Sequence, residues 1–228
     1  MKLSELFENC AYYIDYKQVG DSVNYAFVED DKTRTLYIYF QGSNSITDWV
    51  RNFMFPAIPY RWMENKYRVH RGFLAAWKEV KDIIKNKILE PYTPLLCLKW
   101  QHIVIVGYSH GAALAGLCHE FVWYYRPDLR ENGLEGYGFE SPRFYGGFKV
   151  KDSLKERWEK FIVIRTNGDL VTHCPPAIFG FCHVGKLLKI KGDTSLVHNK
   201  QPKCIKSHYP QVVLDALLKY EEEQSLLN

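Results

Sequence analysis

The feature that most constrains the fold is the pentapeptide Gly107-Tyr108-Ser109-His110-Gly111, a G-x-S-x-G between two contrasting segments. The β-branched run at 102–106 is typical of a buried parallel strand, and the alanine-rich stretch 112–125 is helical in character. A serine on such a tight strand-to-helix turn projects its hydroxyl from the edge of a sheet, and the crowded backbone requires small flanking residues. We therefore expect Ser109 to be a nucleophile. A glycine-flanked turn with an ordinary capping serine is the alternative.

The rest of the chain alternates between strand and helix patterns, which predicts an α/β fold with a mostly parallel central sheet and helices on both faces. We find no repeat and no Gly/Ser-rich linker in the 228 residues, so a single domain over residues 1–228 is expected. The predicted strands cover 23–29, 35–40, 134–139, 161–166 and 183–190, and the predicted helices cover 3–13, 72–89 and 210–224.

Charge and composition argue against several classes of protein. The net charge is only +4 with both signs interspersed, so we expect no nucleic-acid partner. No segment has the roughly 18–20 consecutive apolar residues that a membrane span needs. The first residues carry Glu5 and Glu8 and lack an apolar core, which predicts a cytoplasmic protein, or a secreted one if a leader was removed.

The six cysteines are scattered, as is typical of free thiols in a reducing compartment. Cys97 and Cys118 have apolar neighbours and are expected in the core. The pairs His173-Cys174 and Cys182-His183 lack the two-residue gap that lets one turn supply two zinc ligands. We therefore expect no metal there.

A serine nucleophile needs a histidine base that is oriented by a carboxylate, in the chain order serine, acid, histidine. Asp169 follows a predicted strand in a polar turn, and Asp193 is the alternative acid. Among the histidines that follow Asp169, the candidates for the base are His183, His198 and His208.

Five further segments, besides the G-x-S-x-G, follow one another along the chain. They are Tyr39-Phe40-Gln41-Gly42-Ser43 with Trp49, Val69-His70-Arg71-Gly72-Phe73, Phe139-Glu140-Ser141-Pro142-Arg143, Asn167-Gly168-Asp169-Leu170-Val171 with Pro175-Pro176, and Phe181-Cys182-His183-Val184-Gly185. With these motifs in this order, residues 35–208 resemble the class 3 lipase family, which includes the fungal triacylglycerol lipases.

The resemblance implies an α/β-hydrolase fold and a serine-dependent hydrolase of carboxylic esters, such as acylglycerols, that works through an acyl-enzyme. It implies a catalytic triad of Ser109, Asp169 and His208, and an oxyanion hole formed by Ser43 and His110. It marks His183 as structural. This chemistry needs no metal or organic cofactor. A phospholipase or another acyl-ester hydrolase with the same triad, and a catalytically silent binding protein, are the alternatives.

The chain departs from the family pattern at five positions, although none of the changes removes a residue that the chemistry requires. Gln41, Tyr108, His110, Glu140 and Thr172 stand where arginine, histidine, leucine, glycine and proline are frequent.

Residues 49–62 occupy the position of the family's lid and are rich in Trp, Phe, Met and Ile. They are expected either to cover an apolar cleft and contact a lipid surface, or to pack permanently on the core.

Overall fold

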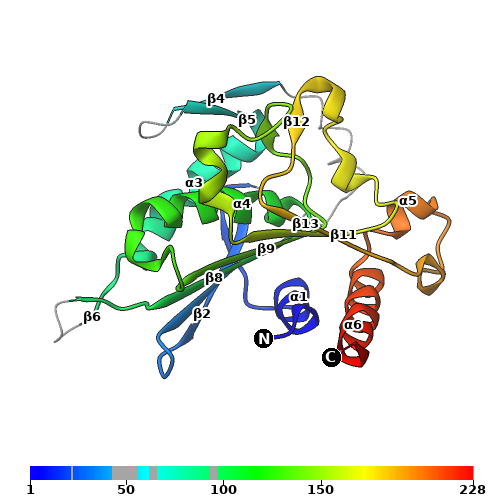
Figure 1. The fold of residues 1–228 in the computed structure, drawn as a ribbon, viewed down its shortest axis with the longest axis horizontal. Helices are drawn as coiled ribbons and strands as arrows, with labels where there is room; N and C mark the ends of the chain where they lie inside the picture. Colours follow the sequence, from blue (N-terminus) through cyan, green and yellow to red (C-terminus); the bar gives the residue numbers. More distant parts are fainter. Residues whose placement is uncertain (22, 43–55, 62–65, 93–96, 228) are drawn as a thin grey trace.

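A computed structural model describes residues 1–21, 23–42, 56–61, 66–92 and 97–227, and within them seven strands form a central twisted sheet (Figure 1). The strands lie in the order β1-β2-β3-β8-β9-β11-β13. The pairs β1–β2 and β2–β3 are antiparallel, and every pairing from β3 onward is parallel. The bounds are β1 Lys17–Val19, β2 Val23–Asp30, β3 Thr35–Phe40, β8 His102–Tyr108, β9 Leu134–Phe139, β11 Phe161–Thr166 and β13 Lys186–Ile190.

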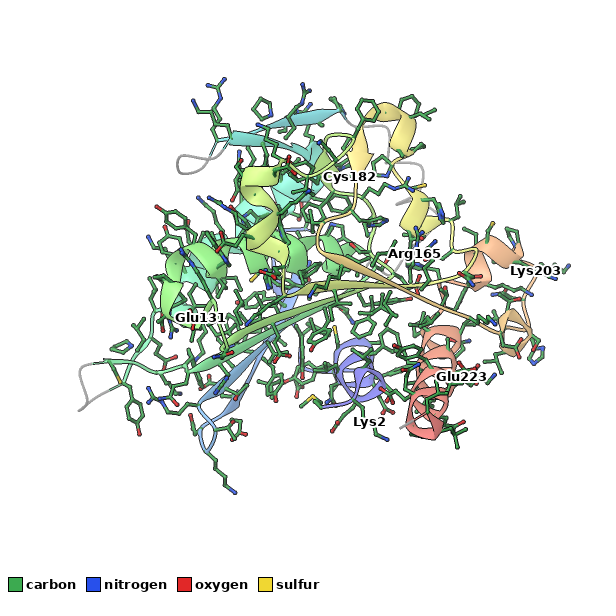
Figure 2. The ribbon with its side chains drawn as sticks, in the orientation of Figure 1. Lys2, Glu131, Arg165, Cys182, Lys203 and Glu223 are labelled. Atoms are coloured by element: carbon green, nitrogen blue, oxygen red, sulfur yellow. The ribbon has the colours of Figure 1, made fainter. Side chains whose placement is uncertain are left out.

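Helices cover both faces of this sheet, which confirms the expected α/β-hydrolase arrangement. α3 (Arg71–Ile88) and α4 (His110–Tyr125) lie on one face, and α1 (Leu3–Ala11) and α6 (Pro210–Leu226) lie on the other (Figure 1). Side chains fill the space between the sheet and the helices on both sides (Figure 2). The result is two apolar cores, one centred on residues such as Trp77 and Ile103, and the other on residues such as Phe7 and Phe139.

The helix that follows the serine turn is buried on all sides. Every residue from His110 to Val122 in α4 is buried, and five of the seven residues 110–116 are glycine or alanine. A methyl group added to Gly116 would lie 2.5 Å from the Phe144 ring, so small residues are what allow this helix to lie close to its neighbours. The carboxylate of Glu120 in this helix is paired with the buried guanidinium of Arg157.

A second sheet of four short antiparallel strands, in the order β12-β10-β5-β4, lies above α3 in the view of Figure 1. The sequence patterns do not predict it. Its strands are β4 Ala57–Arg61, β5 Lys66–His70, β10 Tyr145–Gly146 and β12 Phe181–Cys182. Of the segment 49–62, residues 49–55 and 62 lie outside the described residues. The part from 57 to 61 is strand β4, and its Tyr60 is buried and accepts a 2.9 Å hydrogen bond from Trp77 Nε1. This end of the segment is therefore packed on the core.

The remaining elements are short. They are β6 Pro91–Tyr92, β7 Cys97–Leu98, the helix α5 Lys203–Lys206, and the 3-10 helices Pro127–Leu129, Asp152–Trp158, Val171–His173, Ala177–Phe179 and Thr194–Leu196. Cys97 lies in the β6–β7 hairpin and is exposed, so its predicted place in the core is wrong, whereas Cys118 is buried in α4. All six cysteines are free thiols. Among the described helices, none is both long and apolar enough to cross a membrane.

The two ends of the described chain lie side by side below the sheet (Figure 1). Ser4 in α1 donates from its backbone N–H (2.9 Å) and its hydroxyl (2.6 Å) to the carboxylate of Glu221 in α6. The first and last helices thus cover the same face of the sheet together.

Candidate active site

Ser109 lies at the junction of β8 and α4, at the carboxyl end of a central parallel strand. Its backbone has φ 55° and ψ −122°, a conformation that is costly for a residue with a side chain. The flanking glycines make the bend possible: a Cβ on Gly107 would lie 2.2 Å from the Gly111 oxygen, and one on Gly111 would lie 2.2 Å from the Phe40 oxygen. The predicted tight turn is therefore present, with the steric demand that the sequence implied.

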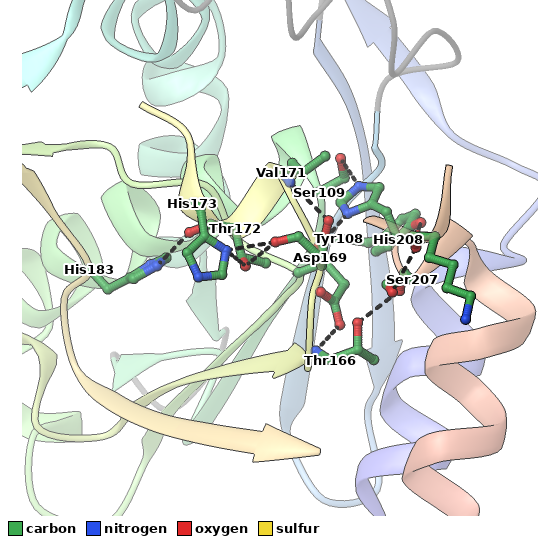
Figure 3. A network of polar contacts seen from close by, with 12 residues as sticks. Tyr108, Ser109, Thr166, Asp169, Val171, Thr172, His173, His183, Ser207 and His208 are labelled. Carbon is green, nitrogen blue, oxygen red and sulfur yellow. Dashed lines mark hydrogen bonds and ion pairs between the residues drawn. The ribbon is translucent and has the colours of Figure 1, made fainter. Parts of the chain in front are cut away.

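Three of the predicted site residues meet at this turn, although they are far apart in sequence. Ser109 Oγ donates to His208 Nε2 over 2.7 Å, and His208 Nδ1 donates to Asp169 Oδ2, also over 2.7 Å (Figure 3). Ser109 is 4% exposed, and both partners are fully buried. A hydroxyl, an imidazole and a carboxylate in one line form the arrangement that activates a serine for attack on an acyl group.

Asp169 is held in place by the loop that follows β11. Its Oδ1 accepts a hydrogen bond from the Val171 N–H at 2.9 Å, and its backbone carbonyl accepts from Thr172 Oγ1 and His173 Nδ1 (Figure 3). Burial alone raises the pKa of Asp169, but the charge and hydrogen bond of His208, together with further hydrogen bonds, lower it overall. The carboxylate is thus ionised and aimed at the imidazole.

His208 lies between α5 and α6 and is fixed through its backbone as well as its ring. The Tyr108 hydroxyl donates to the His208 carbonyl, and the two rings stack with their centroids 5.4 Å apart. The preceding residue, Ser207, accepts a 2.8 Å hydrogen bond at its carbonyl from Thr166 Oγ1. Tyr108 is one of the departures from the family pattern, and here it positions the histidine.

The alternative triad residues lie elsewhere. Asp193 caps the short helix Thr194–Leu196 through hydrogen bonds from Ser195, and His198 is exposed in the loop that follows. His183 lies between β12 and β13, and its Nε2 donates to the Thr172 carbonyl at 2.9 Å. Burial lowers the pKa of His183 to about 3, so its ring is a neutral structural donor that braces the loop of Asp169.

Of the two residues predicted for the oxyanion hole, only His110 can be examined, since Ser43 lies outside the described residues. His110 is the first residue of α4, where backbone N–H groups have no partner within the helix. Its ring is buried and packs 5.4 Å from the Phe73 ring. Burial lowers the pKa of His110 to about 4, with a smaller effect of His70 in the same direction. The ring is therefore neutral near pH 7 and adds no cation beside the serine.

A fourth residue at the site is Glu140, which the sequence indicated only as a departure from the family pattern. Glu140 follows β9 and is fully buried, and its Oε1 accepts a 2.7 Å hydrogen bond from the Thr166 N–H. One potential ligand atom from each of Glu140, Asp169 and His208 lies within 4.8 Å of the others. Both ring nitrogens of His208 are already hydrogen-bonded to Asp169 and Ser109, so this cluster is organised around the triad.

In the described part of the chain, the pairs His173-Cys174 and Cys182-His183 form no cluster of three potential metal ligands. His173 and His183 instead hydrogen-bond to backbone carbonyls of the loop around Asp169. These residues brace the site.

The chain is similar in sequence to known lipases. The model of the family "Lipase (class 3)" matches residues 37–179. The chain is 30% identical to a lipase of Rhizomucor miehei over 162 residues, which is 68% of this chain and 42% of that protein. It is 29% identical to the secreted mono- and diacylglycerol lipase 1 of Fusarium solani over 162 residues, 69% of this chain and 45% of that one.

Solved structures agree on the fold. Lipase II from Rhizopus niveus superposes with a TM-score of 0.63 at 24% identity, over 85% of this chain and 74% of that one. The curated relatives are longer, and the chain spans less than half of their length.

Proposed function

The chain belongs to the class 3 lipase family, and from this premise we propose that it is a serine-dependent carboxylic ester hydrolase with acylglycerols or similar lipid esters as substrates. The observation that carries the proposal is the hydrogen-bonded line from Asp169 through His208 to Ser109, with 2.7 Å at each step. Such a line supports acyl transfer from an ester to the serine and then to water.

Each residue has a defined task in this reaction. His208 Nε2 takes the hydroxyl proton as Ser109 Oγ attacks the ester carbonyl carbon, and Asp169 stabilises the resulting imidazolium. The protonated Nε2 then gives its proton to the leaving alkoxide, so an alcohol departs and an acyl-enzyme remains. Water attacks the acyl carbon with the same base, and the carboxylic acid and the free serine are released.

The negative oxygen of the tetrahedral intermediate needs donors that are already in place. The backbone N–H of His110, at the amino end of α4, is one such donor, and the helix dipole adds to the stabilisation of the negative oxygen. Ser43 is the second donor by likeness to the family. The ring of His110 is neutral and adds no charge on this side of the site, in keeping with an uncharged lipid ester.

Hydrolysis of short- and long-chain p-nitrophenyl esters tests this proposal directly. Ser109→Ala is expected to lower kcat by at least about 10⁴-fold, because no other group replaces the nucleophile. A fluorophosphonate probe should label the wild-type protein at Ser109 and leave the variant unlabelled. Esterase activity that persists unchanged in the variant would refute Ser109 as the nucleophile, and wild-type protein that resists the probe would favour the catalytically silent alternative.

The choice among ester classes follows from a panel of acyl lengths and head groups. The names of the relatives, lipase and mono- and diacylglycerol lipase, support acylglycerols ahead of phospholipids. A higher rate on emulsified than on dissolved substrate would support contact of residues 49–62 with a lipid surface. Faster hydrolysis of phospholipids than of acylglycerols would select the phospholipase alternative.

We propose one domain over residues 1–228, supported by the packing of α1 and α6 on the same sheet.

The location of the protein is a separate question. Six free thiols support a cytoplasmic protein, whereas one relative is named as secreted. Fractionation of the cells that produce the protein would decide between the two locations.

A further inference from the structure

Glu140 occupies a strained position beside the triad. It follows β9 directly at the carboxyl end of the parallel sheet, and its φ of 51° lies in the left-handed region that favours glycine. Glycine is also the residue that the family motif places here. The chain thus accepts a backbone cost at this point while it places a carboxyl group where no water reaches it, since Glu140 is 0% exposed.

The two carboxyl oxygens of Glu140 have different surroundings. Oε1 accepts from the Thr166 N–H at 2.7 Å. Among the described residues, no N–H or O–H group donates to Oε2. One carboxyl oxygen of Glu140 lies within 4.8 Å of one carboxyl oxygen of Asp169, and both groups are buried. Two ionised carboxylates at this distance in a buried site repel each other, so we expect the pair to hold one proton.

The surroundings decide which carboxyl group holds that proton. Asp169 accepts from the Val171 N–H and from His208 Nδ1, and both donors favour its ionised form. Burial raises the pKa of Glu140 well above its ordinary value, and the nearby charge of Asp169 raises it further. Tyr108 at the end of β8 lies beside the same cluster, and burial together with the nearby charge of Asp169 raises its pKa too. The group thus contains one anion, Asp169, with neutral Glu140 and Tyr108 beside it.

We propose that Glu140 is a positioning residue of the active site: a buried neutral carboxyl group whose Oε2–H donates to the Asp169 carboxylate and holds it ionised and directed at His208. This assignment rests on the proposed function of the triad. The bond gives the buried Asp169 carboxylate a third donor, in addition to the Val171 N–H and His208 Nδ1. It also draws negative charge away from the oxygen that faces the imidazole.

The protonation state can be tested without any measurement of activity. At pH 8 the infrared spectrum of the wild-type protein should contain the carbonyl band of a buried protonated carboxyl group. The band should persist in Ser109→Ala and vanish in Glu140→Gln. Glu120→Gln is the matched control, because Glu120 is equally buried but is paired with Arg157, and this variant should retain the band.

The pH dependence of stability gives a second readout. With a raised pKa in the folded state, wild-type Glu140 keeps its proton while the unfolded chain releases it above about pH 4.5. The wild type should therefore lose stability relative to Glu140→Gln as the pH rises from about 5 to 8, so the Tm difference between them should grow over this range.

The positioning role is tested by kinetics with two substitutions of similar size. Gln can accept from the Thr166 N–H and donate to Asp169, so Glu140→Gln should keep kcat within about twofold of the wild type. Met offers no donor, so Glu140→Met should lower kcat about tenfold with little change in KM. The acid limb of its pH–rate profile should move to higher pH, because more negative charge then faces the protonated His208.

Three outcomes would overturn this assignment: an infrared band that survives in Glu140→Gln, a Tm difference that does not change with pH, or Glu140→Met with wild-type kcat and pH profile. An unfolded Glu140→Met protein would leave the infrared and stability tests in force. Loss of the proposed esterase function would be recognised separately, since full activity in Ser109→Ala would refute the triad and leave the band unchanged.

Discussion

At the scale of single residues, the sequence limited the triad to a few candidates, but it could not choose among them without the family motifs. Asp169 and Asp193 both follow strand patterns, and His198 and His208 both lie in late polar loops. The structure brings Asp169 and His208 to Ser109. It also brings in Glu140, which no local pattern could indicate, because its partner Asp169 is 29 residues away in the sequence and the contact depends on how β9 and β11 pair.

The assignment of Asp169 rather than Asp193 as the acid of the triad can be tested with a matched pair of variants. Asp169→Asn preserves the shape of the site but favours the wrong tautomer of His208, so kcat should fall by about 10⁴-fold. Asp193→Asn alters only an exposed helix cap, which asparagine can also form, and should leave kcat unchanged. Steady-state hydrolysis of a p-nitrophenyl ester by both variants measures the difference. Equal losses in the two variants would contradict the assignment of Asp169.

At the scale of elements, strong local patterns predicted the bounds well. The expected strands 35–40, 134–139 and 161–166 coincide with β3, β9 and β11. The strand expected over 183–190 begins only at Lys186, because Gly185 adopts a φ of 70° and a Cβ there would lie 2.1 Å from the Phe161 oxygen. The four-stranded sheet went unpredicted, since β10 and β12 are two residues long and are defined by pairing with distant segments.

The junction of β8 and α4 depends on how closely the helix approaches β3. In Gly111→Ala the new methyl group would lie 2.2 Å from the Phe40 carbonyl oxygen, so the start of α4 must shift and Ser109 with it. A shift of this kind should lower kcat/KM by about 10²-fold and destabilise the fold by about 1–3 kcal/mol.

Gly72→Ala is the matched control for this junction. Gly72 lies in the first turn of α3, and the nearest atom to its added methyl group is 3.3 Å away. Its free energy of unfolding should stay within about 1 kcal/mol of the wild type, because alanine is a better helix former. Denaturant titration and ester hydrolysis report both effects. A Gly111→Ala protein as active as Gly72→Ala would show that the tight approach is unnecessary.

At the scale of the whole molecule, the alternation of strands and helices was enough to predict a sheet covered on both faces. It could not predict how the chain ends support the active site. α1 and α6 together close one face, and Phe7 of α1 packs against the rings of Tyr108 and Phe139, the residues that directly precede Ser109 and Glu140. The N-terminal helix thus stabilises the carboxyl ends of two central strands from below.

This support predicts that a substitution far from the serine in sequence destabilises the whole fold. Phe7 is fully buried, so Phe7→Ala should lower the free energy of unfolding by about 3–5 kcal/mol through lost burial and the cavity that remains. Ile14→Ala removes a side chain of the same N-terminal segment that is 89% exposed, and it should change stability by less than about 0.5 kcal/mol. Urea unfolding followed by tryptophan fluorescence measures both. Equal midpoints for the two variants would mean that α1 rests on the sheet without supporting it, and that the strand ends beneath Ser109 are held by α4 and the sheet alone.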